Sequence, residues 1–295
     1  MTDILTTLFG NLNTFIQYAP GTETNITLPD LNASAIVARK RIIAVISTEV
    51  YAAVSATEGE PLDSLRAAMA NLTLANQLIF DTVARKKSET NIYKYEVEAM
   101  KRGYMENYFN AMDSLIQWLS LQTVEENDES SAAALWRRGR YYVNLSMCKI
   151  RNAEQFDALY PIDMSYLFFF RTIPLQRECL SERIGYYYGE VTDANKDSLL
   201  PLLGLALVKK IIAKALRRFD VLEFPSSIRN LFDSSTTSRS GADEHAHAIE
   251  LAAQLDSESD ELLISADAVL ADNNQTDFST VTSFNNPDDK IIMLP

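Results

Sequence analysis

The sequence predicts an all-α protein, built as a helical bundle with an extended C-terminal arm. Glycine and proline each occur only nine times in 295 residues, which is too few for the many tight turns of a sheet-rich fold. The long segments are instead dominated by Ala, Leu, Glu, Lys, Arg and Met, which are good helix formers. The hydrophobic fraction of 47% and the charged fraction of 23% are typical of a globular chain with a packed core.

Residues 1–123 are expected to form an N-terminal helical unit. Its helices are marked by apolar residues that recur at three- and four-residue spacing, and Asp30 or Asn32 can cap one of them. In chain order, the predicted elements are a helix over 2–18, a loop over 19–30, and helices over about 32–56, 61–87 and 92–121.

Residues 124–272 are expected to form a C-terminal helical unit, which the acidic loop "VEENDESS" separates from the first. Asp163 or Ser165 can cap a helix in this unit. Pro174 predicts either a kink or a new first turn, whereas Pro201 fits best in the opening turn of its helix. The predicted elements are helices over 132–160, 166–189, 193–224 and about 242–270, with a break at 161–165 and a mobile polar loop near 225–241.

Two stretches share an order of parts. The first, "RKRIIAVISTEVYAAVSATEGEPLDSL", has Arg-Ile at 41–42 and Ser-Leu at 64–65, where a long helix opens. The second, "SERIGYYYGEVTDANKDSLL", has Arg-Ile at 183–184 and Ser-Leu at 198–199. A polar loop and a third helix follow each stretch. The similarity indicates either an internal duplication of a three-helix, connector-like unit or a chance match.

The charge is unevenly placed along the chain. The formal net charge is −13, and thirteen acidic residues against two basic ones lie from Leu231 onward. The first 230 residues are therefore nearly neutral, and an acidic arm follows them. Such asymmetry indicates an interaction segment. It argues against free duplex DNA as the main ligand, because contacts to phosphates need an excess of lysine and arginine.

No catalytic, metal or cofactor site is recognisable. The two histidines, His245 and His247, are two residues apart on a predicted helix, so they point to different faces and cannot bind one metal together. The chain also lacks a Gly-rich phosphate loop and the paired-carboxylate motif of di-iron bundles. We therefore expect a protein that is not an enzyme and that uses no cofactor and no metal.

The two cysteines, Cys148 and Cys179, lie in predicted helices without metal-ligand spacing. Buried free thiols in a reducing cytoplasm are the favoured interpretation, and a disulfide is the alternative. The first residues lack the basic region and cleavage site of a signal peptide. No uncharged apolar run approaches the ~18 residues of a membrane span. A soluble cytoplasmic protein is expected.

Two helices carry basic clusters that are candidates for an interaction surface. One interpretation is that these clusters pair with the acidic arm of the chain or with a neighbouring subunit. The alternative is a surface that faces nucleic acid, with Tyr141 and Tyr142 as stacking partners. The aromatic runs at 165–174 and 186–188 are core or a subunit interface. The predicted basic surface residues are Arg137, Arg138, Arg140, Lys209, Lys210, Lys214, Arg217 and Arg218.

The C-terminal arm, residues 273–295, ends in the apolar run "IIMLP". Apolar residues at a free terminus gain nothing from water, so the run is expected to be buried somewhere. It either docks on a partner or covers a gap in the core of its own chain. The predicted docking residues are Phe284, Ile291, Ile292, Met293 and Leu294.

Most of the chain resembles a group of phage and prophage proteins of Bacteroidetes-type bacteria. The resemblance rests on the order of "LWRRGRYYVNLSMCKIRNAEQFDALYPIDMSYLFFFRTIPLQRECLSERIG", a Leu/Ala-rich helix, a polar loop and "FNNPDDKIIMLP". Each proposed repeat also resembles the small helical head–tail connector proteins of long-tailed phages. Those proteins have a helix that ends near Ile-Gly, then a variable loop and an Ala/Leu-rich helix.

The resemblance implies a structural head–tail adaptor that forms a homo-oligomeric ring at the portal vertex of a virion. Such a protein is assembled in the host cytoplasm. Its implied partners are the portal protein, other ring proteins of the head–tail junction or tail, and further copies of itself, with DNA only as a contact in the lumen. The alternative is a cytoplasmic helical scaffold or regulatory module that binds one soluble protein. A third class is a nucleic-acid binder that uses the two basic helices.

Overall fold

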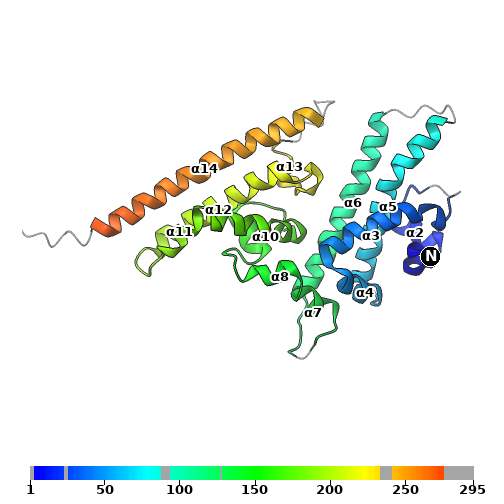
Figure 1. Cartoon of the computed structure of the whole chain (residues 1–295), viewed down its shortest axis with the longest axis horizontal. Helices are drawn as coiled ribbons and strands as arrows, with labels where there is room; N and C mark the ends of the chain where they lie inside the picture. The colour runs from blue at the N-terminus through cyan, green and yellow to red at the C-terminus, as the bar shows by residue number, and fades with distance from the viewer. Residues whose placement is uncertain (1–2, 23–25, 88–93, 127, 233–240, 276–295) are drawn as a thin grey trace, which may run out of the picture.

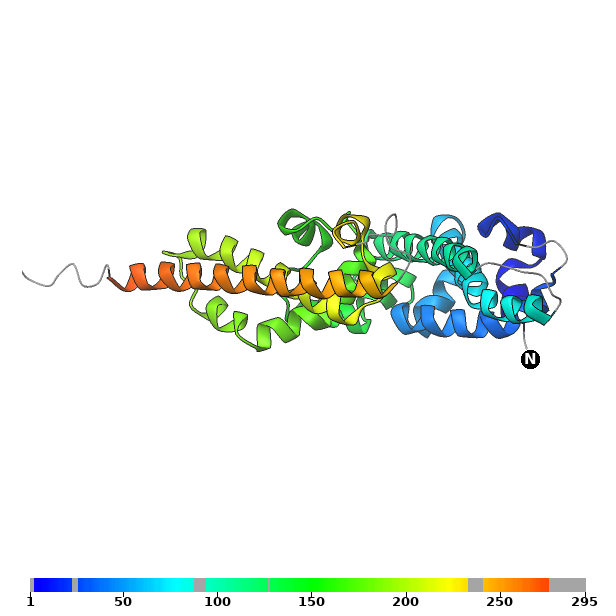
Figure 2. The same cartoon turned by 90° about the horizontal axis from the view of Figure 1, so that it is seen from above.

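The computed structural model describes residues 3–22, 26–87, 94–126, 128–232 and 241–275. Over these residues the chain forms fourteen α-helices and no strand, so the predicted all-α class is confirmed. The molecule is elongated, with the N-terminal helices at one end and the last long helix extending to the other (Figure 1, Figure 2). None of the helices in the described ranges is long and apolar enough to cross a membrane.

The N-terminal half contains two predicted helices that the structure divides. The predicted helix over 2–18 is broken at Gly10, which has a φ of 76°, and the predicted helix over 32–56 is broken at Ser47, which has a φ of 82°. New caps follow, because Asn11 Oδ1 accepts from Thr14 N at 2.9 Å and Ser47 Oγ accepts from Val50 N at 3.3 Å. In order, the elements are α1 (Ile4–Phe9), α2 (Leu12–Tyr18), the 3₁₀ helix η1 (Leu28–Leu31), α3 (Asn32–Ile46), α4 (Thr48–Ser55), α5 (Glu60–Lys87) and α6 (Lys94–Leu121).

The prediction of one helix over 132–160 is wrong, because three short helices lie there. Gly139 begins the first break, where an added Cβ would lie 2.8 Å from the Trp136 carbonyl oxygen. The second break lies between the second and third short helices. Buried Gln176 fixes it, because its Oε1 accepts from Lys149 N at 2.9 Å and from Ile150 N at 2.8 Å. The three helices are α7 (Ala132–Arg137), α8 (Arg140–Leu145) and α9 (Ala153–Leu159).

The remaining long helices follow the predicted order with shifted ends, but a short helix, Ser226–Arg229, lies in the stretch predicted as a polar loop near 225–241. Ser165 caps the next helix, since its Oγ accepts from Phe168 N at 3.1 Å, and Pro174 lies inside that helix without ending it. The predicted helix over 166–189 is divided before Ile184, and Pro201 lies in the second turn of its helix rather than the first. The elements are α10 (Tyr166–Ser181), α11 (Ile184–Gly189), α12 (Lys196–Arg218), the 3₁₀ helix η2 (Val221–Glu223), α13 (Ser226–Arg229) and α14 (Gly241–Gln275).

The aromatic run of α10 lies in the core. Phe168, Phe169 and Phe170 are all buried, and Trp136 packs edge-on against Phe170 with ring centroids 5.0 Å apart. In the second aromatic run, the side chain of Tyr186 is 65% exposed. The first run therefore belongs to the interior of this chain, while the second presents one ring to the outside.

A shared order of four helices occurs in both halves, although η2 and α13 interrupt it before the last helix of the second half. A long helix, a short helix and a second long helix follow one another as α3, α4 and α5, and again as α10, α11 and α12. A third long helix then packs on the second, α6 on α5 and α14 on α12 (Figure 1). The halves touch where Asp113 Oδ1 of α6 accepts from Leu167 N of α10 at 2.7 Å. The predicted boundary between two units remains a prediction.

Candidate interaction surface

Helix α12 is held between α10 and α14, and small residues allow α14 to approach it closely. Ala252, Ser259 and Ala266 of α14 are fully buried, as is Ala206 of α12. At the centre of the contact, Ser259 Oγ donates to the Ala206 carbonyl oxygen at 2.9 Å. This bond satisfies a buried hydroxyl and fixes the position of α14 along α12.

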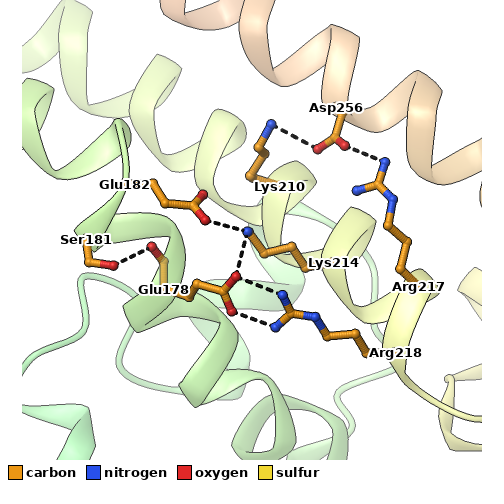
Figure 3. A network of polar contacts seen from close by, with 8 residues as sticks. All are labelled: Glu178, Ser181, Glu182, Lys210, Lys214, Arg217, Arg218 and Asp256. Carbon is orange, nitrogen blue, oxygen red and sulfur yellow. Dashed lines mark hydrogen bonds and ion pairs between the residues drawn. The ribbon is translucent and has the colours of Figure 1, made fainter.

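The side of α12 that faces α10 carries an ion-pair network (Figure 3). Arg218 donates two hydrogen bonds to the two carboxylate oxygens of Glu178, at 2.6 and 2.8 Å. Lys214 Nζ donates to Glu178 at 2.9 Å and to Glu182 at 2.8 Å. The hydrogen bonds from Arg218 and then from Lys214 lower the pKa of Glu178 to about 2. Glu178 and Glu182 therefore neutralise the positive charges of Lys214 and Arg218, for which the sequence alone identifies no partner.

A second set of pairs joins α12 to α14. Asp256 forms ion pairs with Lys210 at 3.0 Å and with Arg217 at 2.5 Å, so one carboxylate pairs with two cations (Figure 3). Lys209 binds Glu258, and this hydrogen bond is the main cause of the lowered pKa of that carboxyl. All five basic residues predicted as a surface on this helix therefore have carboxylate partners within the chain.

The predicted pairing of basic residues with the acidic arm of the chain is confirmed for Lys209, Lys210 and Arg217. The pairs with α10 were not predicted. Glu178 and Glu182 are four residues apart, so they share a helix face, and that spacing is a signal the sequence does contain. Asp256 and Glu258 belong to the predicted acidic arm, but their individual partners were not predicted. They reach the cations of α12 because α14 lies antiparallel to α12. The packing of small residues between the two helices sets that alignment.

The three arginines of the first basic cluster bind backbone carbonyls instead of carboxylates. Arg137 Nη2 donates to the Gln122 carbonyl at 2.5 Å, and Arg140 Nη2 donates to the Ala44 carbonyl at 2.5 Å. Arg138 Nη2 donates to the Glu129 carbonyl. These cations keep their full charge, because a neutral carbonyl does not cancel it.

The two tyrosines proposed as stacking partners for bases are already packed. Tyr141 is buried, and the Arg140 guanidinium lies 4.8 Å from its ring centroid. Tyr142 stacks on Phe170, with centroids 5.6 Å apart and planes 28° apart. Both rings therefore serve the fold of this chain.

The chain was compared with protein-family models, curated proteins and solved structures. No family model matches the chain, and no curated protein or solved structure matches it.

The remaining residues singled out from the sequence occupy unrelated places. Cys148 and Cys179 are buried free thiols. His245 and His247 are both exposed on α14, and the part of the chain that the structure describes contains no group of three metal-ligating side chains. The predicted docking residues Phe284, Ile291, Ile292, Met293 and Leu294 lie outside the described residues.

Proposed function

We propose that this chain is a structural head–tail adaptor of a tailed bacteriophage, whose copies form a ring at the portal vertex and dock through the C-terminal arm. The observation that carries the proposal is the recurring helix order, α3–α4–α5–α6 and α10–α11–α12–α14. It supports a duplicated version of the small helical connectors that each proposed repeat is expected to resemble. A ring subunit of this kind needs surfaces for its neighbours and needs no active site.

The charge distribution supports lateral association between copies. Glu250, Asp260 and Glu261 are exposed on α14, and each points away from the buried stripe that packs on α12. Arg138 and Arg140 are exposed on other elements, and their positively charged guanidinium groups donate to the backbone carbonyls of Glu129 and Ala44. Opposite charges on two faces of one subunit favour a heterologous contact, and such contacts form a ring when the rotation between neighbouring subunits closes.

The arm supplies the second part of the proposal. Its apolar residues can add to an edge or fill a groove on the portal or on a neighbouring copy. Burying them contributes about 25 cal/mol for each Å² removed from water. Repetition around a ring multiplies this contribution through avidity.

Electron microscopy of the protein mixed with the portal protein encoded nearest to its gene tests the proposal. We expect a ring on the portal with the full chain, and loss of that ring when the chain is truncated after Phe284. A ring that survives truncation would keep the adaptor and assign the arm to its own core. Absence of a ring with either chain would refute the adaptor and favour a helical scaffold that binds one soluble partner.

Charge reversal separates lateral contacts from docking by the arm. The triple variant Glu250→Lys, Asp260→Lys and Glu261→Lys is expected to abolish the ring while it leaves the helical content unchanged. A matched control reverses three exposed acids away from α14, at Glu58, Glu125 and Glu126. Equal loss of the ring in both variants would mean that net charge, and no particular face, controls assembly.

A further inference from the structure

A cleft lined by three arginines lies where the N-terminal helices meet the helices of the second half. Its volume is about 120 Å³. Arg41 comes from α3, Arg140 from α8 and Arg171 from α10, and Glu223 of η2 is the one carboxylate among the described residues of the lining. Buried Tyr108 of α6 forms part of the wall. Five elements that are far apart in the sequence therefore line the cleft, and three of them each contribute one guanidinium group.

The contacts of the three guanidinium groups leave the cleft positively charged. Arg171 Nη2 donates to Glu223 Oε2 at 2.7 Å. Arg140 Nη2 donates to the Ala44 carbonyl and, at 3.1 Å, to the Tyr141 hydroxyl, and both acceptors are neutral. Arg41 lies over aromatic rings, 5.5 Å from the centroid of Tyr108. Three positive charges against one negative charge give the lining a net charge of +2.

The charged groups around the Tyr108 hydroxyl are also ones that line the cleft. Burial raises the pKa of its hydroxyl to about 12, and Arg41, Glu223 and Arg171 are the charged groups that act on it. The hydroxyl therefore lies within electrostatic reach of two of the three arginines and of the carboxylate.

From this juxtaposition we infer that the cleft binds one phosphate dianion, either free phosphate or the terminal phosphate of a small ligand. The volume is several times the ~10–15 Å³ that one water molecule needs, which leaves room for one tetrahedral oxyanion. Guanidinium forks match phosphate oxygens geometrically and bind them with charge-assisted hydrogen bonds. A phosphate monoester carries a charge of about −1.5 to −2 at neutral pH, which the net charge of the lining balances.

A carboxylate or a nucleic-acid phosphodiester is a poorer match, because each carries a single negative charge. The proposal goes beyond the adaptor function and does not depend on it. A bound dianion joins α3, α8 and α10, so it stabilises the contact between the two halves of the molecule.

Isothermal titration calorimetry of the full chain with inorganic phosphate, in a buffer of low ionic strength, tests the site. We expect one phosphate per chain, and binding at least tenfold tighter than that of acetate. Arg41→Gln and Arg140→Gln are each expected to weaken phosphate binding at least tenfold. The matched control is Arg177→Gln, which removes one positive charge from the same helix as Arg171 but lies outside the cleft. It is expected to change the affinity less than twofold.

A gain of affinity provides the second readout. Glu223→Gln removes the carboxylate that the described part of the lining contains and releases Arg171, so it is expected to tighten phosphate binding several-fold. Circular dichroism confirms that each variant is folded. Absence of phosphate binding by the native chain, or equal weakening by Arg177→Gln and Arg41→Gln, would overturn the proposal. Tighter binding of a single-stranded oligonucleotide that displaces phosphate would also overturn it, and would assign the cleft to a nucleic-acid backbone.

Discussion

Glu178 of α10 and Arg218 of α12 form a two-pronged ion pair, with hydrogen bonds of 2.6 and 2.8 Å to the two carboxylate oxygens. Lys214 binds the same carboxylate, so a single acid joins α10 to two successive turns of α12. This geometry fixes both planar groups relative to each other. It also makes α12 a structural centre of the second half of the molecule.

Replacing Glu178 with glutamine is expected to lower the free energy of unfolding by about 1 kcal/mol at pH 7, because the pair is partly exposed and water screens it. The native pKa of about 2 lies below the ordinary value of 4.5. The stabilisation is therefore fully present above pH 4.5 and is lost as the pH falls through 2. Urea denaturation of both proteins between pH 2 and 7 measures the difference. A difference that stays constant down to pH 2 would contradict the assigned pKa. Glu126→Gln, in the acidic loop, is the control.

Gly185, in the first turn of α11, is expected to tolerate no side chain. An added Cβ would lie 2.0 Å from the Leu180 carbonyl oxygen, which belongs to the rigid backbone of α10. Gly185→Ala should therefore lower the free energy of unfolding by roughly 2–4 kcal/mol. The control is Gly103→Ala in α6, where nothing lies within 4 Å of the added atom. That variant should be stabilised by about 0.5–1 kcal/mol, since alanine favours a helix. Guanidinium denaturation compares the two, and equal stabilities would refute the close approach.

Enlarging Ala252 to leucine is expected to separate α14 from α12. Ala252 is fully buried in that contact, so the larger side chain forces neighbouring groups apart and lowers stability by about 1–3 kcal/mol. Ala246 is exposed on the same helix, and Ala246→Leu serves as the matched control with little expected effect. Thermal unfolding followed by circular dichroism gives the comparison. A native melting temperature in Ala252→Leu would mean that α14 is not packed as described.

The two thiols are expected to be unreactive in the folded protein. Burial raises the pKa of Cys148 to about 11 and that of Cys179 to about 12, so almost no thiolate exists at pH 8. Titration with a disulfide reagent at pH 8 should label neither cysteine in native protein and both in denaturant. Rapid labelling of one thiol without denaturant would show that its helix opens easily.

The sequence by itself determined the helical class, the order of the long helices and several of their ends. Scarce glycine and proline, strong helix formers and apolar spacing predict these features because they act within a few turns of one helix. Ser165 was predicted as one of two caps, and it is the residue that caps α10. The aromatic run of α10 was predicted as core or interface, and its three phenylalanines lie in the core.

Only the tertiary structure decided where the helices divide and which charges meet. Buried Gln176 holds residues 149–150 out of a helix from a position 26 residues away, and no local pattern records that contact. The same holds for the arginine-lined cleft, because Arg41 and Arg171 lie 130 positions apart in the numbering and line one cleft through packing alone. Local propensity specifies a helix, whereas the partner of a buried polar group or a charge depends on which surfaces the core brings together.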